Sequence, residues 1–171
     1  MVAVTQTLLG IFGSKFVTPQ SGVLMNNGIM WFDPEPGSTN SLGGGKRTLC
    51  NYTPVIAQVG PDKMMAVGAS GGRRILPAVA QMLSFAIDYG MDLDSAFHCP
   101  RIDASEGPTI IGDARLDAQT HALLAASFDY EQARLQHLPM KFACPSSVMR
   151  RGAQNTGGTE IFQPWADAVA G

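Results

Sequence analysis

The sequence contains few cysteines and no pattern that would pair them or bind a metal. Cys50, Cys99 and Cys144 are odd in number and far apart, and none belongs to a Cys-x-x-Cys or Cys/His arrangement that would suit zinc. We therefore interpret all three as buried or free thiols. The sequence gives no reason to expect a metal site or a cofactor.

Long apolar runs and clusters of one charge are also missing. No stretch reaches the ~18 apolar residues of a membrane span, and no run of Lys or Arg accompanies the formal net charge of −2. We therefore expect neither a membrane span nor a nucleic-acid partner. Residues 1–14 carry no positive charge before their apolar residues, so they make a poor signal peptide.

The residues that are present suffice for a hydrophobic core. The chain has 171 residues, of which 45% are hydrophobic, and a chain of this length buries roughly 70% of the surface that its unfolded form exposes. Its 19 glycines exceed the ~7% typical of proteins and predict many tight turns and close backbone approaches. We expect a single domain over residues 1–171.

The first half of the sequence favours strands and loops. Alternating apolar residues predict strands at residues 1–8 and about 15–25. Since the first strand begins at once, we expect the sequence to be truncated. Residues 33–46 are rich in Pro, Gly and Ser and predict a long loop, which inside a compact domain is usually functional or mobile. Apolar runs at residues 53–59 and 63–68 flank a Gly-Pro-Asp turn and predict a hairpin.

The clearest predicted element is a helix that begins at about Arg74 and is closed by Gly90 as a C′ residue. Its apolar residues at helical spacing are Ile75, Val79, Met82, Leu83, Ala86 and Ile87. Asp92 is expected to cap a short helix that Pro100 stops, and Asp117 a further helix. The residues expected to face inward around that last helix are Leu116, Leu123 and Leu124.

The C-terminal part, residues 146–162, predicts short strands joined by a turn at Gly157-Gly158. Strands, helices and strands therefore follow one another along the chain. This order predicts an α+β layered domain.

The strongest local feature for chemistry is the segment from Gly68 to Arg74, between a predicted strand and the long helix. Gly71 and Gly72 let backbone N–H groups point outward at a helix N-terminus, which suits a phosphate or the oxyanion of an acyl-transfer intermediate. The segment is not a Walker A loop, because no Gly-Lys-Ser/Thr follows. The alternative interpretation is a plain strand-to-helix turn.

No nucleophile or metalloprotease motif is intact, because neither Gly-x-Ser-x-Gly nor His-Glu-x-x-His occurs. His98, His121 and His137 are scattered along the chain, and we interpret each as a surface or helix-end residue rather than a catalytic base.

The order of several segments resembles the start of the γ-glutamyltranspeptidase small subunit. The resemblance covers roughly residues 1–130 and weakens after that. The segments that carry it are Val4-Thr5-Gln6-Thr7, Phe12-Gly13-Ser14, Ser21 to Asn27, Gly45-Lys46-Arg47, Thr53-Pro54, Ser70-Gly71-Gly72-Arg73, Ile87 to Met91, and Ala96 to Arg101.

The resemblance implies an N-terminal-nucleophile hydrolase that is made as a self-cleaving precursor. The cut frees a Thr whose own α-amine is the base for its hydroxyl. The implied fold is a four-layer αββα sandwich shared with the large-subunit chain of the same precursor, which is the expected partner. In the family the nucleophilic Thr stands upstream of the position of Met1, so we expect this chain alone to lack it and to be inactive.

The resemblance also assigns the catalytic machinery within this chain. Thr7 matches the family's second Thr, which hydrogen-bonds the nucleophile. Gly71 and Gly72 match the oxyanion-hole glycines, the same pair that the residue pattern indicates independently.

The substrate-binding positions depart from the family. Leu9 stands where the family has a polar residue that holds the glutamyl α-amino group, and Gly28 and Trp31 stand at the Gln and Asp positions that serve the same group. Cys50 and Asn51 stand where a Ser pair holds the α-carboxylate. A buried ammonium without its carboxylate partner costs several kcal/mol, so these positions predict an altered acyl specificity.

Three functions remain open on this basis. The first is a γ-glutamyltransferase-like acyltransferase or amidohydrolase that acts on small-molecule γ-glutamyl or related acyl amides. The second is a cephalosporin-acylase-like amidohydrolase, and the third is a non-catalytic truncated product or partner-binding subunit. The tail, residues 154–171, departs from the family, and Trp165 within it is interpreted as a surface residue.

Overall fold

The computed structural model describes residues 1–134, 140–164 and 166–169, and His137 and Trp165 lie outside the described residues. The chain divides into two compact units, which are described separately. The first, here the sheet unit, combines Met1–Thr5 with Tyr52–Gly171, and the second, here the loop unit, is Gln6–Asn51. The single domain expected from chain length stays a prediction.

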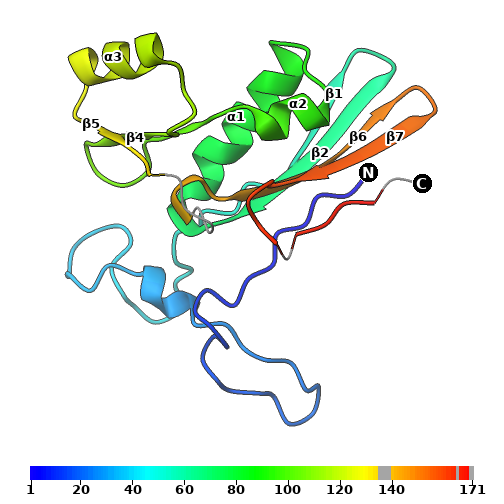
Figure 1. Cartoon of the computed structure of the whole chain (residues 1–171). Coiled ribbons are helices and arrows are strands. Elements are labelled where there is room, and N and C mark those ends of the chain that lie inside the picture. The colour runs from blue at the N-terminus through cyan, green and yellow to red at the C-terminus, as the bar shows by residue number, and fades with distance from the viewer. Residues whose placement is uncertain (135–139, 165, 170–171) are drawn as a thin grey trace. The chain divides into compact units, whose positions relative to one another are not determined.

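The sheet unit is built on a four-stranded antiparallel sheet with the order β1-β2-β6-β7 (Figure 1). The strands are β1 (Val55–Val59), β2 (Lys63–Ser70), β6 (Cys144–Arg151) and β7 (Gln154–Thr159). The predicted hairpin around the Gly-Pro-Asp turn is confirmed as β1 and β2. Strand β6 lies beside β2, although more than 70 residues separate them in sequence. The sheet therefore brings together early and late segments of the sheet unit's sequence.

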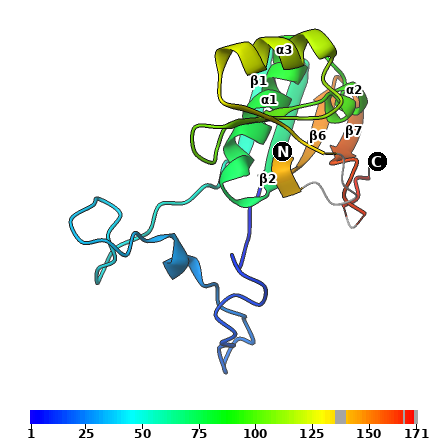
Figure 2. The same ribbon diagram turned by 60° about the vertical axis from the view of Figure 1, so that its left-hand side comes forward.

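Helices cover one face of this sheet, with α1 (Ile75–Ile87) and α2 (Leu93–His98) in front of the strands in Figure 2. Met65 of β2 and Met149 of β6 are paired in register, and both are buried beneath Val79 and Met82 of α1. Full burial of such side chains contributes about 1.5–3 kcal/mol each. The core therefore lies between the helices and this face of the sheet.

The predicted ends of the helices are largely confirmed. A 3-10 turn, η2 (Gly72–Arg74), leads directly into α1, as expected from a start at about Arg74. Gly90 follows the last turn of α1 with φ of 68°, the left-handed conformation that ends a helix. Asp92 caps α2, since its Oδ1 accepts the N–H of Ser95 at 2.8 Å.

A second, smaller sheet has the order β3-β4-β5, with β3 (Ile102–Asp103), β4 (Ile110–Gly112) and β5 (Tyr130–Gln132). Helix α3 (Ala118–Ser127) precedes β5, and Asp117 caps it as predicted by accepting the N–H of Thr120. The expectation that Leu123 faces inward is wrong, because α3 exposes 61% of this side chain. A short 3-10 turn, η3 (Met140–Phe142), precedes β6.

The two strands predicted at residues 1–8 and 15–25 are wrong. Residues 1–5, 160–164 and 166–169 run along the face of the large sheet opposite α1 (Figure 1), but no ladder in the described chain includes residues 1–8. Alternation alone does not make a strand without a partner that pairs with it. Residues 15–25 form only an isolated bridge between Val17 and Leu24.

The predicted turn at Gly157-Gly158 is also wrong, because both glycines lie inside β7 and the turn falls at residues 152–153. Gly158 faces α2, and a Cβ atom there would lie 2.6 Å from the ring of Phe97. These glycines serve close packing and not chain reversal.

The loop unit contains one regular element, the 3-10 turn η1 (Gly28–Trp31), which the sequence did not predict. Residues 33–46 form the predicted loop, which an isolated bridge between Asp33 and Ser41 closes on itself. Across the described ranges of both units, no helix is long and apolar enough to cross a membrane.

We predict that Gly158→Ala destabilises the chain by about 1–3 kcal/mol, because the added methyl group overlaps the buried Phe97 ring. The measurement is the midpoint of urea unfolding. Gly44→Ala is the control, since a Cβ atom at Gly44 meets no atom within 4 Å. Equal midpoints for the two variants would show that α2 shifts away from β7 at little cost.

Candidate functional site

The turn between β2 and α1 requires glycine at two successive positions. Gly71 has φ of 138° and Gly72 has φ of 65°, a backbone region that side chains disfavour. A Cβ atom on Gly71 would lie 2.7 Å from the Cα atom of Ala143, whereas a Cβ atom on Gly72 would meet nothing within 4 Å. Gly71 therefore permits close contact with the Ala143 backbone, and Gly72 borders open space.

A buried ion pair lies behind this turn. Ala143 is buried and has φ of 56°, and the preceding carbonyl of Phe142 accepts a hydrogen bond from Arg101 Nη2 at 3.3 Å. The same guanidinium is paired with Glu160, and both side chains are almost fully buried. Loss of one partner from such a pair costs about 3–5 kcal/mol. The pair therefore holds firmly the backbone of residues 142 and 143 that Gly71 contacts.

Strand pairing places the thiol of Cys144, next to Ala143, beside the glycine turn, since Cys144 pairs with Ser70. Burial raises the pKa of its thiol to about 11, and the nearby Glu160 carboxylate acts in the same direction. Burial also raises the pKa of Cys99. Because the thiolate is the nucleophile, a thiol that stays neutral at pH 7 is a poor one. Cys144 is therefore a poor candidate for a catalytic nucleophile.

The two described histidines have structural partners. His98 lies at the end of α2, as predicted, and its Nδ1 atom is 2.8 Å from the carbonyl oxygen of Asp94. His121 is half-buried within α3, and its Nδ1 atom is hydrogen-bonded to the hydroxyl of Tyr130, so the prediction of a surface or helix-end position is wrong for this residue.

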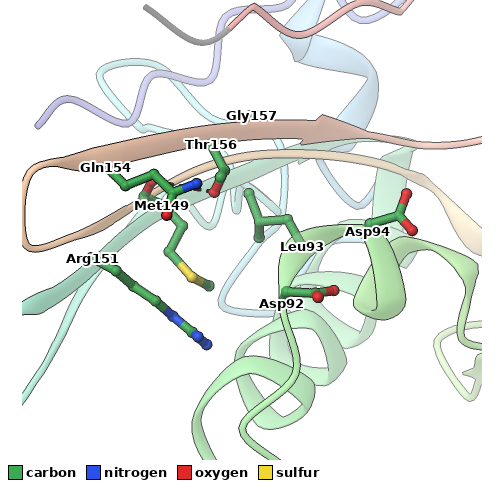
Figure 3. Close-up of a pocket in the computed structure, with 8 residues that line it drawn as sticks. All are labelled: Asp92, Leu93, Asp94, Met149, Arg151, Gln154, Thr156 and Gly157. Atoms are coloured by element: carbon green, nitrogen blue, oxygen red, sulfur yellow. Dashed lines mark hydrogen bonds between the residues drawn. The ribbon is translucent and has the colours of Figure 1, made fainter.

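A pocket of about 420 Å³ in the sheet unit lies away from the glycine turn (Figure 3). Its lining comes from α2, β6 and β7: Asp92, Leu93, Asp94, Met149, Arg151, Gln154, Thr156 and Gly157. Arg151 pairs with Lys63 at one end of β2, while Cys144 pairs with Ser70 at the other end. At roughly 3.3 Å per strand residue, more than 20 Å of strand separates this pocket from the turn. None of the predicted site residues lines it.

In the loop unit, Thr7 and Leu9 belong to one tightly bonded segment. The Thr7 hydroxyl oxygen accepts the N–H of Leu9 at 3.0 Å. Asn27 binds on both sides of Leu9, since its N–H donates to the Leu8 carbonyl at 3.0 Å and its Oδ1 accepts the Gly10 N–H at 2.8 Å. These bonds hold Leu9 half-buried at φ of 72°, a conformation that costs a non-glycine residue roughly 1–2 kcal/mol.

A second asparagine connects the other predicted substrate positions. Gly28 and Trp31 are the two ends of η1. The Asn40 side-chain amide donates to the Trp31 carbonyl at 2.7 Å, and its oxygen accepts the N–H of Leu49 at 3.0 Å. Leu49 directly precedes Cys50, which is exposed, and Asn51, which is half-buried.

The loop unit thus gathers the six predicted residues at positions 7, 9, 28, 31, 50 and 51, and the sheet unit carries Gly71 and Gly72. The roles of Asn27 and Asn40, which join these segments, were not predicted. Neither an Asn before a Gly nor an Asn inside a Gly- and Ser-rich loop has a local signature of a long-range hydrogen bond.

Comparison with known proteins supplies the family context. A family model described as gamma-glutamyltranspeptidase matches residues 1–167. The Acylase ACY 1 proenzyme of Pseudomonas sp. (strain V22) is 34% identical over 125 residues, which cover 73% of this chain and 22% of the acylase. The glutathione hydrolase proenzyme of Bacillus subtilis (strain 168) is 36% identical over 102 residues, which cover 60% of this chain and 17% of that protein. The chain therefore spans about a fifth of these relatives.

Solved structures share the fold. Gamma-glutamyltranspeptidase from Pseudomonas nitroreducens has a TM-score of 0.77 at 23% identity, over 98% of this chain and 92% of that chain. Cephalosporin acylase from Bacillus halodurans has a TM-score of 0.70 at 19% identity, over 96% of this chain and 30% of that chain. These likenesses confirm the predicted α+β class and the fold of N-terminal-nucleophile hydrolases.

We predict that iodoacetamide at pH 8 labels the exposed Cys50 much faster than Cys144. The raised pKa keeps the Cys144 thiol protonated, and its labelling should accelerate as the pH rises toward about 11. Peptide mass spectrometry over a pH series measures both rates, with Cys50→Ser as the control that removes the fast site. Rapid labelling of Cys144 at pH 8 would contradict the assignment of a neutral thiol.

Proposed function

The chain belongs to the gamma-glutamyltranspeptidase family, and from that membership we propose that it supplies the oxyanion site and the acyl pocket of an amidohydrolase. The observation that carries the proposal is the turn before α1, in which Gly71 and Gly72 both have positive φ and a Cβ atom on Gly72 would meet nothing within 4 Å. Backbone N–H groups in such a turn suit the oxygen anion of a tetrahedral intermediate.

The proposed reaction is acyl transfer from an amide. The nucleophile is a Thr hydroxyl from residues outside the 171 described by this sequence, with its own α-amine as base. It attacks the amide carbonyl, and the resulting oxyanion is held by the turn at Gly71 and Gly72. Collapse releases the amine, which takes up the proton, and water then hydrolyses the acyl ester. Thr7 serves as the hydrogen-bond partner of the nucleophile, since a hydroxyl that accepts the Leu9 N–H can still donate its own proton.

The expected partner is a second chain or segment of the same precursor. The relatives are named as proenzymes, and this chain spans about a fifth of them. The sheet face opposite α1 supports this proposal, because half of Ile56 and 43% of Val148 are exposed on it. An apolar sheet face of this kind suits a second sheet, as in the four-layer sandwich. Without that partner we expect no activity from the 171 residues.

The acyl pocket that we propose differs from a γ-glutamyl pocket. Leu9, Gly28 and Trp31 offer no carboxylate to a substrate ammonium, and the half-buried Leu9 and Trp31 add apolar surface. Asn51 can still donate a hydrogen bond to a substrate carboxylate, and Cys50 can do so weakly. A cephalosporin-acylase-like activity on acyl groups without an α-amino group fits these residues better than glutathione hydrolysis. The similarity to Acylase ACY 1 supports this choice.

A non-catalytic role as a partner-binding subunit is the rival from another class. A partner-binding role would also explain the exposed sheet face, but it would not explain the geometry of the glycine turn. The two predictions that follow separate it from an enzyme.

We predict that Gly72→Val in the assembled enzyme lowers kcat roughly 100-fold, the typical effect of losing one oxyanion donor, and changes KM much less. Valine keeps the backbone N–H but disfavours the φ of 65° at this position, so the backbone and its N–H should turn away from the oxyanion. The measurement is steady-state hydrolysis of an acyl anilide. Gly107→Val is the matched control, because Gly107 has a similar φ of 77° and a Cβ atom there also meets nothing within 4 Å. Equal losses of kcat in both variants would contradict the oxyanion role and show that the Gly71-Gly72 turn is only structural.

We predict that the assembled enzyme hydrolyses a glutaryl anilide with higher kcat/KM than the γ-glutamyl anilide, because the α-ammonium has no acidic partner at positions 9, 28 and 31. Trp31→Asp should shift the ratio toward the γ-glutamyl compound. Trp31→Phe is its control and should leave the ratio near the starting value. A starting preference for the γ-glutamyl anilide would contradict the proposed specificity.

A further inference from the structure

We infer that Asn40 is the positioning residue of the acyl pocket and sets its selectivity by holding two substrate-binding segments at a fixed separation. The inference rests on the proposed function and deepens it. The observation behind it is a single side chain that bonds both to the end of η1 and to the segment that leads into Cys50 and Asn51.

The bonding pattern uses the amide in one orientation. Its Nδ2 donates to the Trp31 carbonyl at 2.7 Å, and its Oδ1 accepts the Leu49 N–H at 3.0 Å. An amide turned by 180° would place oxygen against oxygen and N–H against N–H. Asp cannot replace Asn here, because a carboxylate keeps the acceptor for Leu49 but has no proton to donate to Trp31.

The backbone of Asn40 is fixed separately from its side chain. The Asn40 carbonyl accepts the N–H of Asp33 at 2.9 Å, and the next residue, Ser41, is buried and donates its hydroxyl to the Ser38 carbonyl at 2.6 Å. These hydrogen bonds hold the backbone that carries the Asn40 side chain in a fixed position. Changes to this side chain remove the two bridging bonds without opening the loop.

The bridge joins η1 to a segment that has no regular secondary structure. Residues 47–54 form no helix or strand, and Leu49 and Cys50 are exposed. In this segment the Leu49 N–H bond fixes the backbone one residue before Cys50. A displacement of about 1 Å between parts of a site can cost up to 100-fold in rate, so a bridge of this kind can govern how well an acyl group fits.

The role of Asn40 differs from that of Asn27. Asn27 holds Leu9 beside Gly28 through bonds to residues 8 and 10. Asn40 holds Trp31 relative to Cys50 and Asn51. Asn27 therefore fixes the segment around Leu9, and Asn40 fixes the segment that leads to the residues proposed to bind the substrate carboxylate.

The first experiment measures the bridge itself in the 171-residue chain. Amide hydrogen exchange at Leu49, followed by NMR, should accelerate at least tenfold in Asn40→Ala and remain slow in Asn40→Asp, which keeps the acceptor oxygen. Ser41→Ala is the matched control, because it removes a hydrogen bond of the same loop that contacts neither segment. Unchanged exchange at Leu49 in Asn40→Ala would overturn the inference.

The second experiment measures selectivity in the assembled enzyme with glutaryl and acetyl anilides. Both Asn40→Ala and Asn40→Asp should lower kcat/KM for the glutaryl compound roughly tenfold, mainly through KM, and leave the short acetyl compound within about twofold. A loss of folded protein alone would instead lower kcat for both substrates equally. Ser41→Ala should preserve the glutaryl-to-acetyl ratio.

The outcomes separate the inference from the function on which it rests. An unaltered enzyme that hydrolyses neither anilide would overturn the proposed function and this role with it. An active enzyme in which Asn40→Ala keeps the glutaryl-to-acetyl ratio would overturn the role of Asn40 alone.

Discussion

The contact between two backbones, at Gly71 and Ala143, is the constraint on which the sheet unit depends. No side chain fits between the two, since a Cβ atom on Gly71 would lie 2.7 Å from the Ala143 Cα atom. The contact joins the start of α1 to the segment before β6, and the buried Arg101–Glu160 pair holds that segment from behind. The turn that we propose for catalysis is therefore fixed by contacts with segments that follow it much later in the sequence.

The residues proposed to form the acyl pocket are held in place by a different kind of interaction. The loop unit has almost no regular secondary structure, and hydrogen bonds from two asparagines take the place of sheet ladders. Such bonds are directional and each contributes about 1 kcal/mol, so they define positions without building a core. A scaffold of this type can change its side chains at positions 9, 28 and 31 while the backbone frame stays the same, which agrees with the similarity of this chain to both acylases and glutathione hydrolases.

Features governed by neighbouring residues could be predicted from the sequence. The caps at Asp92 and Asp117 and the start of α1 depend on a few consecutive positions, and the structure confirms them. Gly71 and Gly72 form a turn between a strand and a helix, while their oxyanion role stays a prediction. Features that depend on distant partners could not. The alternation in residues 1–8 suggests a strand that no described segment pairs with, and Gly158 suggests a turn although its role is to admit the Phe97 ring. Asn40 was missed for the same reason, since its two partners lie nine residues away on either side.

The left-handed backbone of Leu9 has a consequence for how this pocket evolves. Leucine carries conformational strain at φ of 72°, whereas glycine or asparagine adopts that region readily. Replacement of Leu9 by a small polar residue therefore relaxes the backbone while it removes apolar surface from the pocket. Backbone strain alone therefore favours glycine or asparagine at position 9, so the leucine is retained at a conformational cost of roughly 1–2 kcal/mol.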